Sequence, residues 1–490
     1  MSGFTQHLIA GRGSFAAAWP GVAFLLALAL APGAARLSPR KEKRMKPITS
    51  HPENPHYFLF RGKPTVLITS GEHYGAVLNL DFDCVPYLDT LAADGLNLTR
   101  LFSGCYREVP GSFNIQGNTL APAPGRFICP WPRTATPGAS DGGGKFDLTR
   151  WDEAYFRRLR DFCAQAGKRG VVVEVVLFCP FYEDVLWQND PMNAANNVNG
   201  VGAVPREEVY TLKHPDLMAV HTAMTRRIVQ ELKDLDNVYY EICNEPYFGG
   251  VTMEWQHRIA DTIVAAEAAL PNRHLIAQNV ANGSAKVENP HPAVSLFNFH
   301  YASPPDAVGV NYGLGKAIGF NETGFAGNAD ATYRAQAWEF LLAGGSLFNN
   351  LDYSFTAGHE RGTFRYPETQ PGGGSPELRR QLRVLKEFLY RFDFVKMAPD
   401  NAVIKGGVPA GGAARALAEP GKAYAVYVRG SGRAELLLAV PAGRYRAEWV
   451  NTHTGAVEKA EGLQHAGGEL RVAAPPYVED IALRLVRATG

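Results

Sequence analysis

The sequence predicts an α/β fold, a (β/α)8 TIM barrel followed by a small C-terminal antiparallel β-sandwich. Eight short apolar runs alternate with longer amphipathic segments between about residues 60 and 395, the pattern of strands and helices in such a barrel. Beyond Met397 the sequence pattern changes to short runs of β-prone residues separated by Gly and Pro. We therefore expect a barrel domain over 37–395 and a sandwich domain over 396–490.

The barrel strands are predicted from runs of β-branched and other apolar residues. The helices between them are predicted from apolar residues that recur every three or four positions, as in the helix that ends near Gly167, for which Thr149 is the expected N-cap. Strands joined through helices run parallel, so their carboxyl ends all meet at one mouth of the barrel. In chain order the predicted strands span 65–69, 95–102, 171–177, 238–243, 274–278, 294–299, 316–320 and 346–351.

The C-terminal sandwich is predicted from evenly spaced short strands with turn residues between them. We expect it to serve as a lid or spacer on the barrel, with sugar binding as the weaker alternative. Its strands are predicted at 423–428, 434–440, 445–450, 470–474 and 481–486.

The first 36 residues are typical of a secretory signal peptide. A weak basic region at Arg12 precedes an apolar run over 15–31, and small residues follow before Arg36. The apolar run is short for a membrane-spanning helix and has Pro20 early in its course. We expect a secreted or periplasmic protein without a membrane span in the mature chain. A translation start at Met45 would instead give a cytoplasmic protein.

The charge of the chain is balanced, with 49 basic and 48 acidic residues. Such a chain has no global field that attracts nucleic acid or an anionic membrane, so we expect a neutral or small partner. No pair of cysteines has zinc-finger spacing, and the sequence lacks the several His and Asp residues at strand ends that a metal-dependent barrel hydrolase uses. Neither a metal nor another cofactor is expected, and the sequence leaves the oligomeric state open.

The six cysteines are expected to be mostly buried free thiols. Cys163 lies on a predicted helix, and Cys179 and Cys243 close predicted strands, so these three occupy core elements rather than loops. A disulfide among the other three stays possible: Cys84, Cys105 and Cys129.

The stretch 238–250 predicts a carboxylate at the mouth of the barrel. Six β-prone residues run directly into Asn244, Glu245 and Pro246. Proline cannot continue a central parallel strand, so the strand ends there and presents Asn244 and Glu245 at its carboxyl edge. Active sites of α/β barrels lie at that edge. Taken alone, Glu245 has a structural alternative as a salt-bridged residue at a strand end.

A second glutamate, Glu322, ends predicted strand seven and is also preceded by an asparagine. In a parallel barrel both glutamates point to the same mouth. Hydrolysis of a glycosidic bond uses such a pair, because one protonated carboxyl gives a proton to the leaving oxygen and one ionised carboxylate attacks the anomeric carbon. The pair therefore indicates a glycoside hydrolase with a carbohydrate substrate.

Between about residues 60 and 395 the sequence resembles clan A of the retaining (β/α)8 glycoside hydrolases, which includes cellulases, β-mannanases and β-galactosidases. By this resemblance Glu245 is the acid/base and Glu322 the nucleophile. The order of barrel and sandwich is also similar to that of apiosidase-like barrel proteins whose C-terminal sandwich is named for collagen binding. The resemblance rests on four strand ends: Arg100, Asn244-Glu245-Pro246, His300-Tyr301 and Glu322.

The same resemblance implies roles for four further residues. Asn244 would contact the substrate 2-hydroxyl, and Arg100 would orient Glu322 and keep it ionised. His300 or Tyr301 would form a hydrogen bond with the nucleophile. Cellulases of family 5 often have His-x-Tyr on strand six, whereas the two residues are adjacent here, so only one is expected to point into the mouth in the same way.

Further substrate-binding candidates follow strands one and eight. Strand eight lacks the tryptophan that usually floors the sugar site, and Asn350 and Asp352 are available in its place. Glu72 and His73 follow strand one and could hold sugar hydroxyls, with a structural Glu–His pair as the alternative. Glu174 lies within strand three, pointing into the barrel or towards a helix, and is assigned no role.

Aromatic residues in the loops at the mouth could stack on pyranose rings. A single aromatic residue in such a loop more often packs within the loop, and only the presence of several together indicates sugar binding. The candidates are Trp131, Trp187, Phe181, Tyr182, Tyr247 and Phe248.

The predicted function is hydrolysis of β-O-glycosidic bonds of oligo- or polysaccharides by a two-glutamate double displacement. Two loops, 104–144 and 178–206, are long enough to wall the mouth into a pocket, which favours exo action on short oligosaccharides. Loops that lie flat would instead extend an open groove. The alternative function is a noncatalytic carbohydrate-binding or scaffold barrel.

Overall fold

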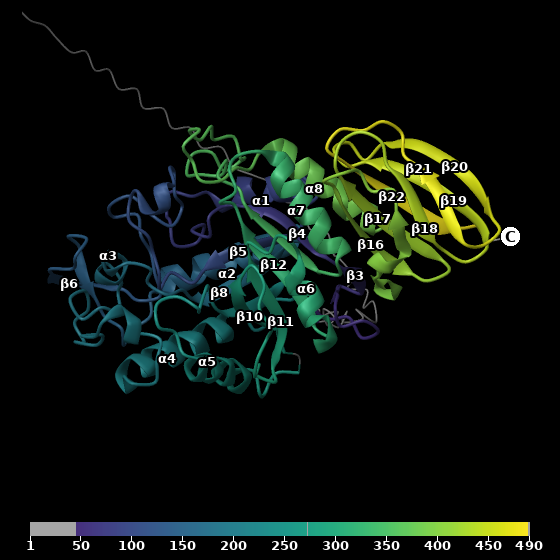
Figure 1. The fold of residues 1–490 in the computed structure, drawn as a ribbon. Helices are drawn as coiled ribbons and strands as arrows, with labels where there is room; N and C mark the ends of the chain where they lie inside the picture. The colour runs from purple at the N-terminus through teal and green to yellow at the C-terminus, as the bar shows by residue number, and fades with distance from the viewer. Residues whose placement is uncertain (1–45, 272, 489–490) are drawn as a thin grey trace, which may run out of the picture. The chain divides into compact units, whose positions relative to one another are not determined.

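The computed structural model describes residues 46–271 and 273–488, and the expected signal peptide at 1–36 lies outside them. The described residues form a (β/α)8 barrel followed by an antiparallel β-sandwich, so the predicted fold class is confirmed (Figure 1). None of the helices in the described ranges combines the length and the apolar character that crossing a membrane requires.

The barrel sheet contains eight strands, and every hydrogen-bonded pair within it is parallel. Most of its residues are buried, because side chains fill the interior and helices cover the outside. The strands are β4 (Leu67–Gly71), β5 (Leu98–Phe102), β8 (Val172–Phe178), β9 (Val238–Cys243), β10 (Ile276–Asn282), β11 (Val294–His300), β12 (Ala317–Thr323) and β13 (Leu347–Leu351).

A side chain closes the barrel where β4 and β5 meet. The sheet order runs from β4 through β13 to β5 without a ladder between the first and last strands. Asn97 bridges this seam, because its Oδ1 accepts from the Ile68 N–H at 2.9 Å and its Nδ2 donates to the Val66 carbonyl at 2.8 Å. One asparagine therefore satisfies backbone groups that a continuous ladder would otherwise pair.

The helices follow the strands in the expected alternation, except that β10 passes to β11 through residues 283–293 without a helix. The predicted N-cap Thr149 is wrong, since its hydroxyl donates to Asp147. Asp152 caps this helix instead and accepts from the Ala154 N–H at 2.9 Å. The helices are α1 (Cys84–Ala93), α2 (Glu153–Lys168), α4 (Pro215–Leu232), α5 (Met253–Ala266), α6 (Asp306–Asn311), α7 (Asp330–Leu342) and α8 (Pro376–Leu389).

The two long loops carry short elements of their own. The loop after β5 contains the 3-10 turn η1 (Ser112–Asn114) and the hairpin β6 (Arg133–Pro137) and β7 (Gly144–Phe146). The loop after β8 contains α3 (Asp184–Gln188) and η2 (Arg206–Glu208).

A small N-terminal sheet packs on the ends of the barrel strands where they begin. It consists of β1 (Thr49–Ser50), β2 (Phe58–Phe60) and β3 (Lys63–Thr65). Ile48, Phe58 and Phe60 share one buried cluster with apolar residues near the starts of the barrel strands, among them Leu98 and Leu347. This cluster plugs the amino-terminal end of the barrel and leaves the carboxyl-terminal end for the site.

The sandwich consists of a six-stranded and a three-stranded antiparallel sheet around a core that includes Trp449. Four of its strands escaped prediction, because β14 and β15 are only two and three residues long, β16 is rich in alanine and the edge strand β20 is mostly polar. The strands are β14 (Ala398–Pro399), β15 (Ile404–Gly406), β16 (Ala413–Glu419), β17 (Ala423–Arg429), β18 (Glu435–Ala439), β19 (Gly443–Asn451), β20 (Val457–His465), β21 (Glu469–Ala473) and β22 (Asp480–Arg487).

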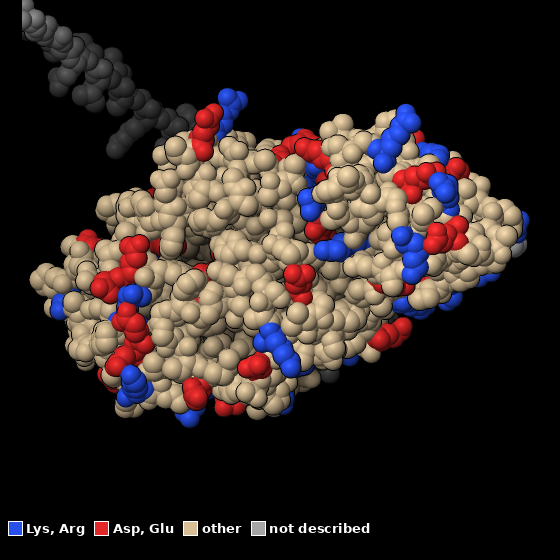
Figure 2. Space-filling view, in the orientation of Figure 1, with Lys and Arg blue, Asp and Glu red and all other residues tan. Residues whose placement is uncertain are grey.

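The sandwich packs against α7 of the barrel. Trp338 stacks on Tyr427 of β17 with ring centroids 5.4 Å apart, and the buried Arg334 forms an ion pair with Asp480 at 3.0 Å. Charged side chains of both signs are interspersed on the face seen in Figure 2, without a continuous patch of either sign.

All six cysteines are free thiols, and five of them are buried. The prediction of buried thiols is therefore confirmed for most of them. The disulfide that the sequence left possible does not form, and Cys84 is the residue of the six that is only half-buried.

Candidate active site

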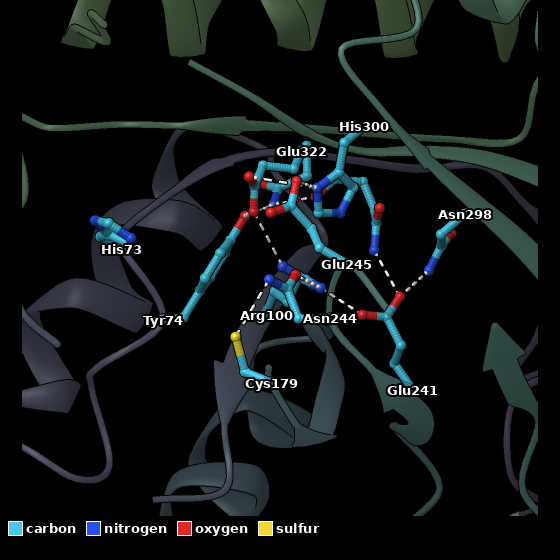
Figure 3. A network of polar contacts seen from close by, with 12 residues as sticks. His73, Tyr74, Arg100, Cys179, Glu241, Asn244, Glu245, Asn298, His300 and Glu322 are labelled. Atoms are coloured by element: carbon cyan, nitrogen blue, oxygen red, sulfur yellow. Dashed lines mark hydrogen bonds and ion pairs between the residues drawn. The ribbon is translucent and has the colours of Figure 1, made fainter. Parts of the chain in front are cut away.

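Glu245 and Glu322 come together at the carboxyl-terminal mouth of the barrel (Figure 3). Glu322 belongs to β12 and Glu245 follows β9 by two positions. A carboxylate oxygen of each lies within 4.8 Å of the other and of a ring nitrogen of His300. The glutamates border a cavity of about 230 Å³ to which all eight barrel strands or the loops after them contribute, and its described lining residues lie between His73 and Leu351.

Three residues at the glutamate pair, and Phe113 with a φ of 53° in the loop after β5, have a strained backbone at the mouth. Tyr74, Glu245 and Tyr301 have φ angles of 58°, 36° and 48°, in the left-handed region that residues other than glycine rarely adopt. Such conformations cost about 1–3 kcal/mol each and persist only where the surrounding structure holds them. All four residues line the cavity, so the strain lies where it directs side chains into the site.

Glu322 accepts four polar contacts from neighbouring side chains. Its Oε2 accepts from the Tyr74 hydroxyl at 2.9 Å and from Arg100 Nη1 at 3.3 Å. Its Oε1 accepts from the Tyr301 hydroxyl at 2.7 Å and lies 3.4 Å from His300 Nδ1. Burial alone would raise the pKa of Glu322, but the charges of His300 and Arg100 and these hydrogen bonds hold it well below its usual range. Glu322 is therefore held ionised.

Two tyrosine hydroxyls and one histidine surround Glu245. Tyr182 donates to its Oε2 at 2.7 Å, Tyr247 donates to its Oε1 at 3.1 Å, and His300 Nδ1 lies 2.9 Å from Oε1. Unlike Glu322, Glu245 has no arginine among the contacts that the structure gives it. The two carboxylates thus lie in different electrostatic environments.

His300 is fully buried between the two carboxylates. Burial lowers the pKa of its imidazole, but the charge of Glu322 and the hydrogen bond to Glu245 outweigh it and raise the pKa to about 9. His300 is therefore an imidazolium near neutral pH. Its positive charge separates two carboxylates that would otherwise repel each other at close range.

His300 and Tyr301 both reach the site, which corrects the expectation that only one of them would. Adjacent side chains of a strand point to opposite faces, but Tyr301 has left the strand in the left-handed conformation. This turn returns its hydroxyl to Glu322. The sequence pattern contained no signal for the turn.

Arg100 holds the site together from below. It is buried in β5, and its Nη2 donates to Asn244 Oδ1 at 2.7 Å and to Glu241. Its Nε lies 3.5 Å from Glu174. Figure 3 shows the guanidinium between Glu322 and the Glu241 carboxylate.

A buried polar layer lies under Arg100. Asn298 donates to Glu174 at 2.8 Å and to Glu241 at 2.7 Å, and Asn321 donates to the same two carboxylates at 3.2 and 2.8 Å. Burial and repulsion from Glu241 raise the pKa of Glu174 to about 8, so this carboxyl is protonated at neutral pH. Glu174 thus points into the barrel, where the sequence had left its direction open.

The donor Tyr74 and the buried Glu241 escaped sequence analysis, and Tyr247 was expected to stack on a sugar rather than to donate to Glu245. Arg100 pairs in register with Glu174, which places both on the inner face of the barrel. A charged residue within an otherwise apolar strand, as at Glu174 and Glu241, was the available signal for this layer. The tyrosines gave none beyond following a strand end.

Three of the predicted substrate contacts have structural roles and do not line the cavity. Glu72 accepts from the Gly75 and Ala76 N–H groups and from Thr119, so it holds a loop. Asp352 forms an ion pair with Arg379 at 2.7 Å, and Asn350 donates to Ser70. His73 does line the cavity but stands apart from the carboxylate cluster in Figure 3.

The aromatic candidates divide into two groups. Trp131, Phe181 and Trp187 are buried in loop packing, which corrects their interpretation as sugar platforms. Trp187, for example, donates its indole N–H to the Val204 carbonyl at 2.8 Å. Tyr182 and Phe248 line the cavity, and Tyr247 contacts Glu245.

Among the described residues, Glu245, His300 and Glu322 form one group with the spacing of metal ligands. The hydrogen-bond donors around these three residues disfavour binding of a cation. Tyrosine hydroxyls and Arg100 already occupy both Glu322 oxygens, and the Arg100 charge repels a metal ion. The arrangement is suited to moving a proton and stabilising a carboxylate.

The fold is similar to that of solved glycoside hydrolases. A candidate glycoside hydrolase from Bacteroides vulgatus ATCC 8482 matches with a TM-score of 0.64 and 14% identity over 91% of this chain and 83% of the other. A family 5 glycoside hydrolase from the same organism matches with a TM-score of 0.61 and 13% identity over 91% and 93%. A further protein named glycoside hydrolase matches with a TM-score of 0.60 and 14% identity over 91% and 97%.

These likenesses show a shared fold at low sequence identity. No known protein family has a sequence profile that matches the chain, and no curated protein matches it.

The buried imidazolium predicts a pH-dependent stability. The pKa of His300 is raised from 6.5 to about 9, so its protonation stabilises the fold fully below pH 6.5, and this contribution is lost as the pH rises through 9. The loss amounts to at most about 3 kcal/mol. We expect the thermal unfolding midpoint of the wild type to fall across this range and that of His300→Gln to fall less.

The difference between the two curves is the quantity to measure. Glu174 and Glu72, with pKa values raised by burial to about 8 and about 7, also lose stabilising protons as the pH rises, but they do so in both proteins. Parallel curves between pH 6.5 and 9 would contradict the assignment.

Proposed function

We propose that the protein is a retaining glycoside hydrolase that cleaves β-O-glycosidic bonds with Glu322 as nucleophile and Glu245 as acid/base. One observation carries the proposal, the approach of carboxylate oxygens of the two glutamates to within 4.8 Å. Retaining enzymes hold their carboxyl groups about 5–5.5 Å apart, whereas inverting enzymes leave about 6.5–9.5 Å for a water molecule. The spacing in this site favours direct attack by a carboxylate.

The mechanism assigns one step to each carboxylate. Glu322 attacks the anomeric carbon, while Glu245 gives its proton to the glycosidic oxygen and the alcohol departs. The product of this step is a glycosyl ester of Glu322. Glu245 then takes a proton from water, which attacks the anomeric carbon and releases Glu322. The sugar leaves with its original anomeric configuration after two inversions.

The remaining contacts of Glu322 support the nucleophile. Burial and the nearby Glu322 charge raise the pKa of Tyr74 and Tyr301, so both hydroxyls remain protonated donors. Arg100 fixes Glu322 and Asn244 at once, and through Asn244 it positions a side-chain amide at the cavity for the substrate 2-hydroxyl.

Two further observations support the proposal. Solved proteins that share the fold over most of this chain carry the name glycoside hydrolase. The Glu322 pKa is lowered although the carboxyl is nearly buried, as a nucleophile that must remain ionised requires.

The volume of the cavity favours exo action. At about 230 Å³ it lies below the roughly 300–1,000 Å³ of sites that enclose drug-sized ligands, so it suits one sugar ring. We expect early release of monosaccharide from a soluble β-linked polysaccharide with little loss of viscosity. A rapid fall in viscosity with mixed oligomers as products would indicate an open groove instead.

The nucleophile is tested by removing its carboxylate. We expect Glu322→Ala to lower the hydrolysis of an activated aryl β-glycoside by about 10⁴-fold or more, because the covalent step is lost. Azide should restore turnover and give the glycosyl azide of inverted configuration, which NMR identifies. Rates equal to the wild type would overturn the role of Glu322.

This experiment also separates the proposal from a noncatalytic barrel. A carbohydrate-binding protein would bind sugars in a screen of glycosides and polysaccharides without turnover. The wild type should instead show turnover that depends on Glu322 for at least one of them.

The acid/base is tested by the leaving group. We expect Glu245→Ala to slow glycosides with poor leaving groups by about 10²–10⁴-fold and those with good leaving groups far less. With a good leaving group the basic limb of the kcat/KM profile should also flatten. A basic limb that survives the substitution would assign it to another group, such as His300.

A further inference from the structure

Exposed aromatic side chains stand at one side of the cavity mouth. Phe113 and Phe248 line the cavity and are 39% and 43% exposed. Their rings pack edge-on against Tyr182 with centroids 5.4 and 5.8 Å away. The three residues come from the loops after β5, β8 and β9 and form a continuous surface that we call the aromatic wall.

The aromatic wall is joined directly to the proposed acid/base. The hydroxyl of Tyr182, its central residue, donates to Glu245 at 2.7 Å. The acid/base protonates the leaving oxygen, so the leaving group must lie on its side of the cavity. The wall therefore borders the site of the leaving group rather than that of the sugar attacked by Glu322.

The exposed part of the wall offers few polar partners. Phe113 and Phe248 carry no donor or acceptor, and the Tyr182 hydroxyl is occupied by Glu245 and by Asn244, which donates to it at 2.9 Å. A sugar leaving group carries several hydroxyls, and losing their water contacts without replacement is costly. Apolar surface buried on the same rings gains about 25 cal/mol per Å².

We propose that the leaving group is apolar and that the substrates are β-glycosides of alkyl or arylalkyl alcohols. The inference rests on the proposed function, because it takes Glu245 as the acid. It adds the class of the group that departs. Stacking of a further pyranose ring on the same aromatic rings is the competing arrangement, which the comparison with a disaccharide tests.

Simple alcohols separate contact from reactivity. Methanol, 1-hexanol and 2-phenylethanol are all poor leaving groups of similar basicity, so differences in kcat/KM among their glycosides report contacts with the protein. The probes are the methyl, hexyl and 2-phenylethyl β-D-glucosides, galactosides, mannosides and xylosides. For the sugar that is accepted, we expect kcat/KM to rise about 10- to 100-fold from methyl to hexyl. The ratio of kcat/KM for the hexyl glycoside to kcat/KM for the 2-phenylethyl glycoside distinguishes a preference for an aliphatic alcohol from a preference for an aromatic one.

The structure offers matched variants. Phe113→Ala and Phe248→Ala should each lower the ratio of kcat/KM for the hexyl glycoside to that for the methyl glycoside by about 3- to 10-fold, because each removes apolar surface that the hexyl chain would contact. Phe325→Ala is the control, because Phe325 also lines the cavity and is 40% exposed but packs on Tyr301, on the side of Glu322. Its substitution should alter both glycosides alike and leave the ratio unchanged.

The outcomes distinguish this inference from the proposed function. Faster turnover of a disaccharide with the same non-reducing sugar than of the hexyl glycoside, or a ratio insensitive to Phe113 and Phe248, overturns the apolar leaving group while glycosidase activity stands. If the wild type hydrolyses none of these probes but turns over an aryl glycoside or a disaccharide, the apolar leaving group is overturned, and if it turns over no glycoside at all, the proposed function fails. Calorimetric binding of the hexyl and methyl glycosides to the same variants then tests the wall, and equal affinities would overturn it.

Discussion

The site depends on one buried charge, the guanidinium of Arg100. An uncompensated charge inside a protein is strongly destabilising, and removing one member of a buried ion pair typically costs about 3–5 kcal/mol. Arg100 is therefore tied to two carboxylates, Glu322 on β12 and Glu241 on β9, and its Nε lies 3.5 Å from the protonated Glu174 on β8. Its planar fork fixes directions as well as distances. Three strands are thereby held in one arrangement, and the nucleophile is held with them.

The price of this arrangement is a polar interior where barrels usually carry packed apolar side chains. Glu174 and Glu241 share the donors Asn298 and Asn321, and a proton on Glu174 removes the repulsion that two buried carboxylates would have. Displacement of either asparagine would break its hydrogen bonds to both carboxylates, so the layer resists movement. A rigid polar layer beneath the site helps to hold the two carboxylates above it at a fixed spacing.

The spacing of apolar residues and the positions of strand ends predicted the barrel. They also predicted that Glu245, Glu322 and Arg100 lie at one end of it, because the carboxyl ends of parallel strands all lie at the same end of a barrel. Side-chain direction beyond a strand end could not be predicted in the same way. Tyr301 enters the site through a left-handed residue, and Asp352 leaves it because Arg379, which is remote in sequence, binds it. Glu72 likewise turns to a loop whose path the sequence does not define. The local sequence pattern thus predicts where a residue lies in the fold, whereas contacts with residues distant in sequence determine where its side chain points.

The N-terminal plug of the barrel bears on the order in which the chain can fold. Ile48 and Phe58 are among the first described residues to be synthesised, yet the cluster that buries them includes Leu347 of the last barrel strand. Contacts of such large sequence separation form late, because the loop between them must be closed first. The cover of the apolar face of β2 is therefore complete only after the last barrel strand, β13, has been synthesised. Complete burial of the plug and the ladder between β4 and β13 both need β13, so a chain truncated before this strand lacks both.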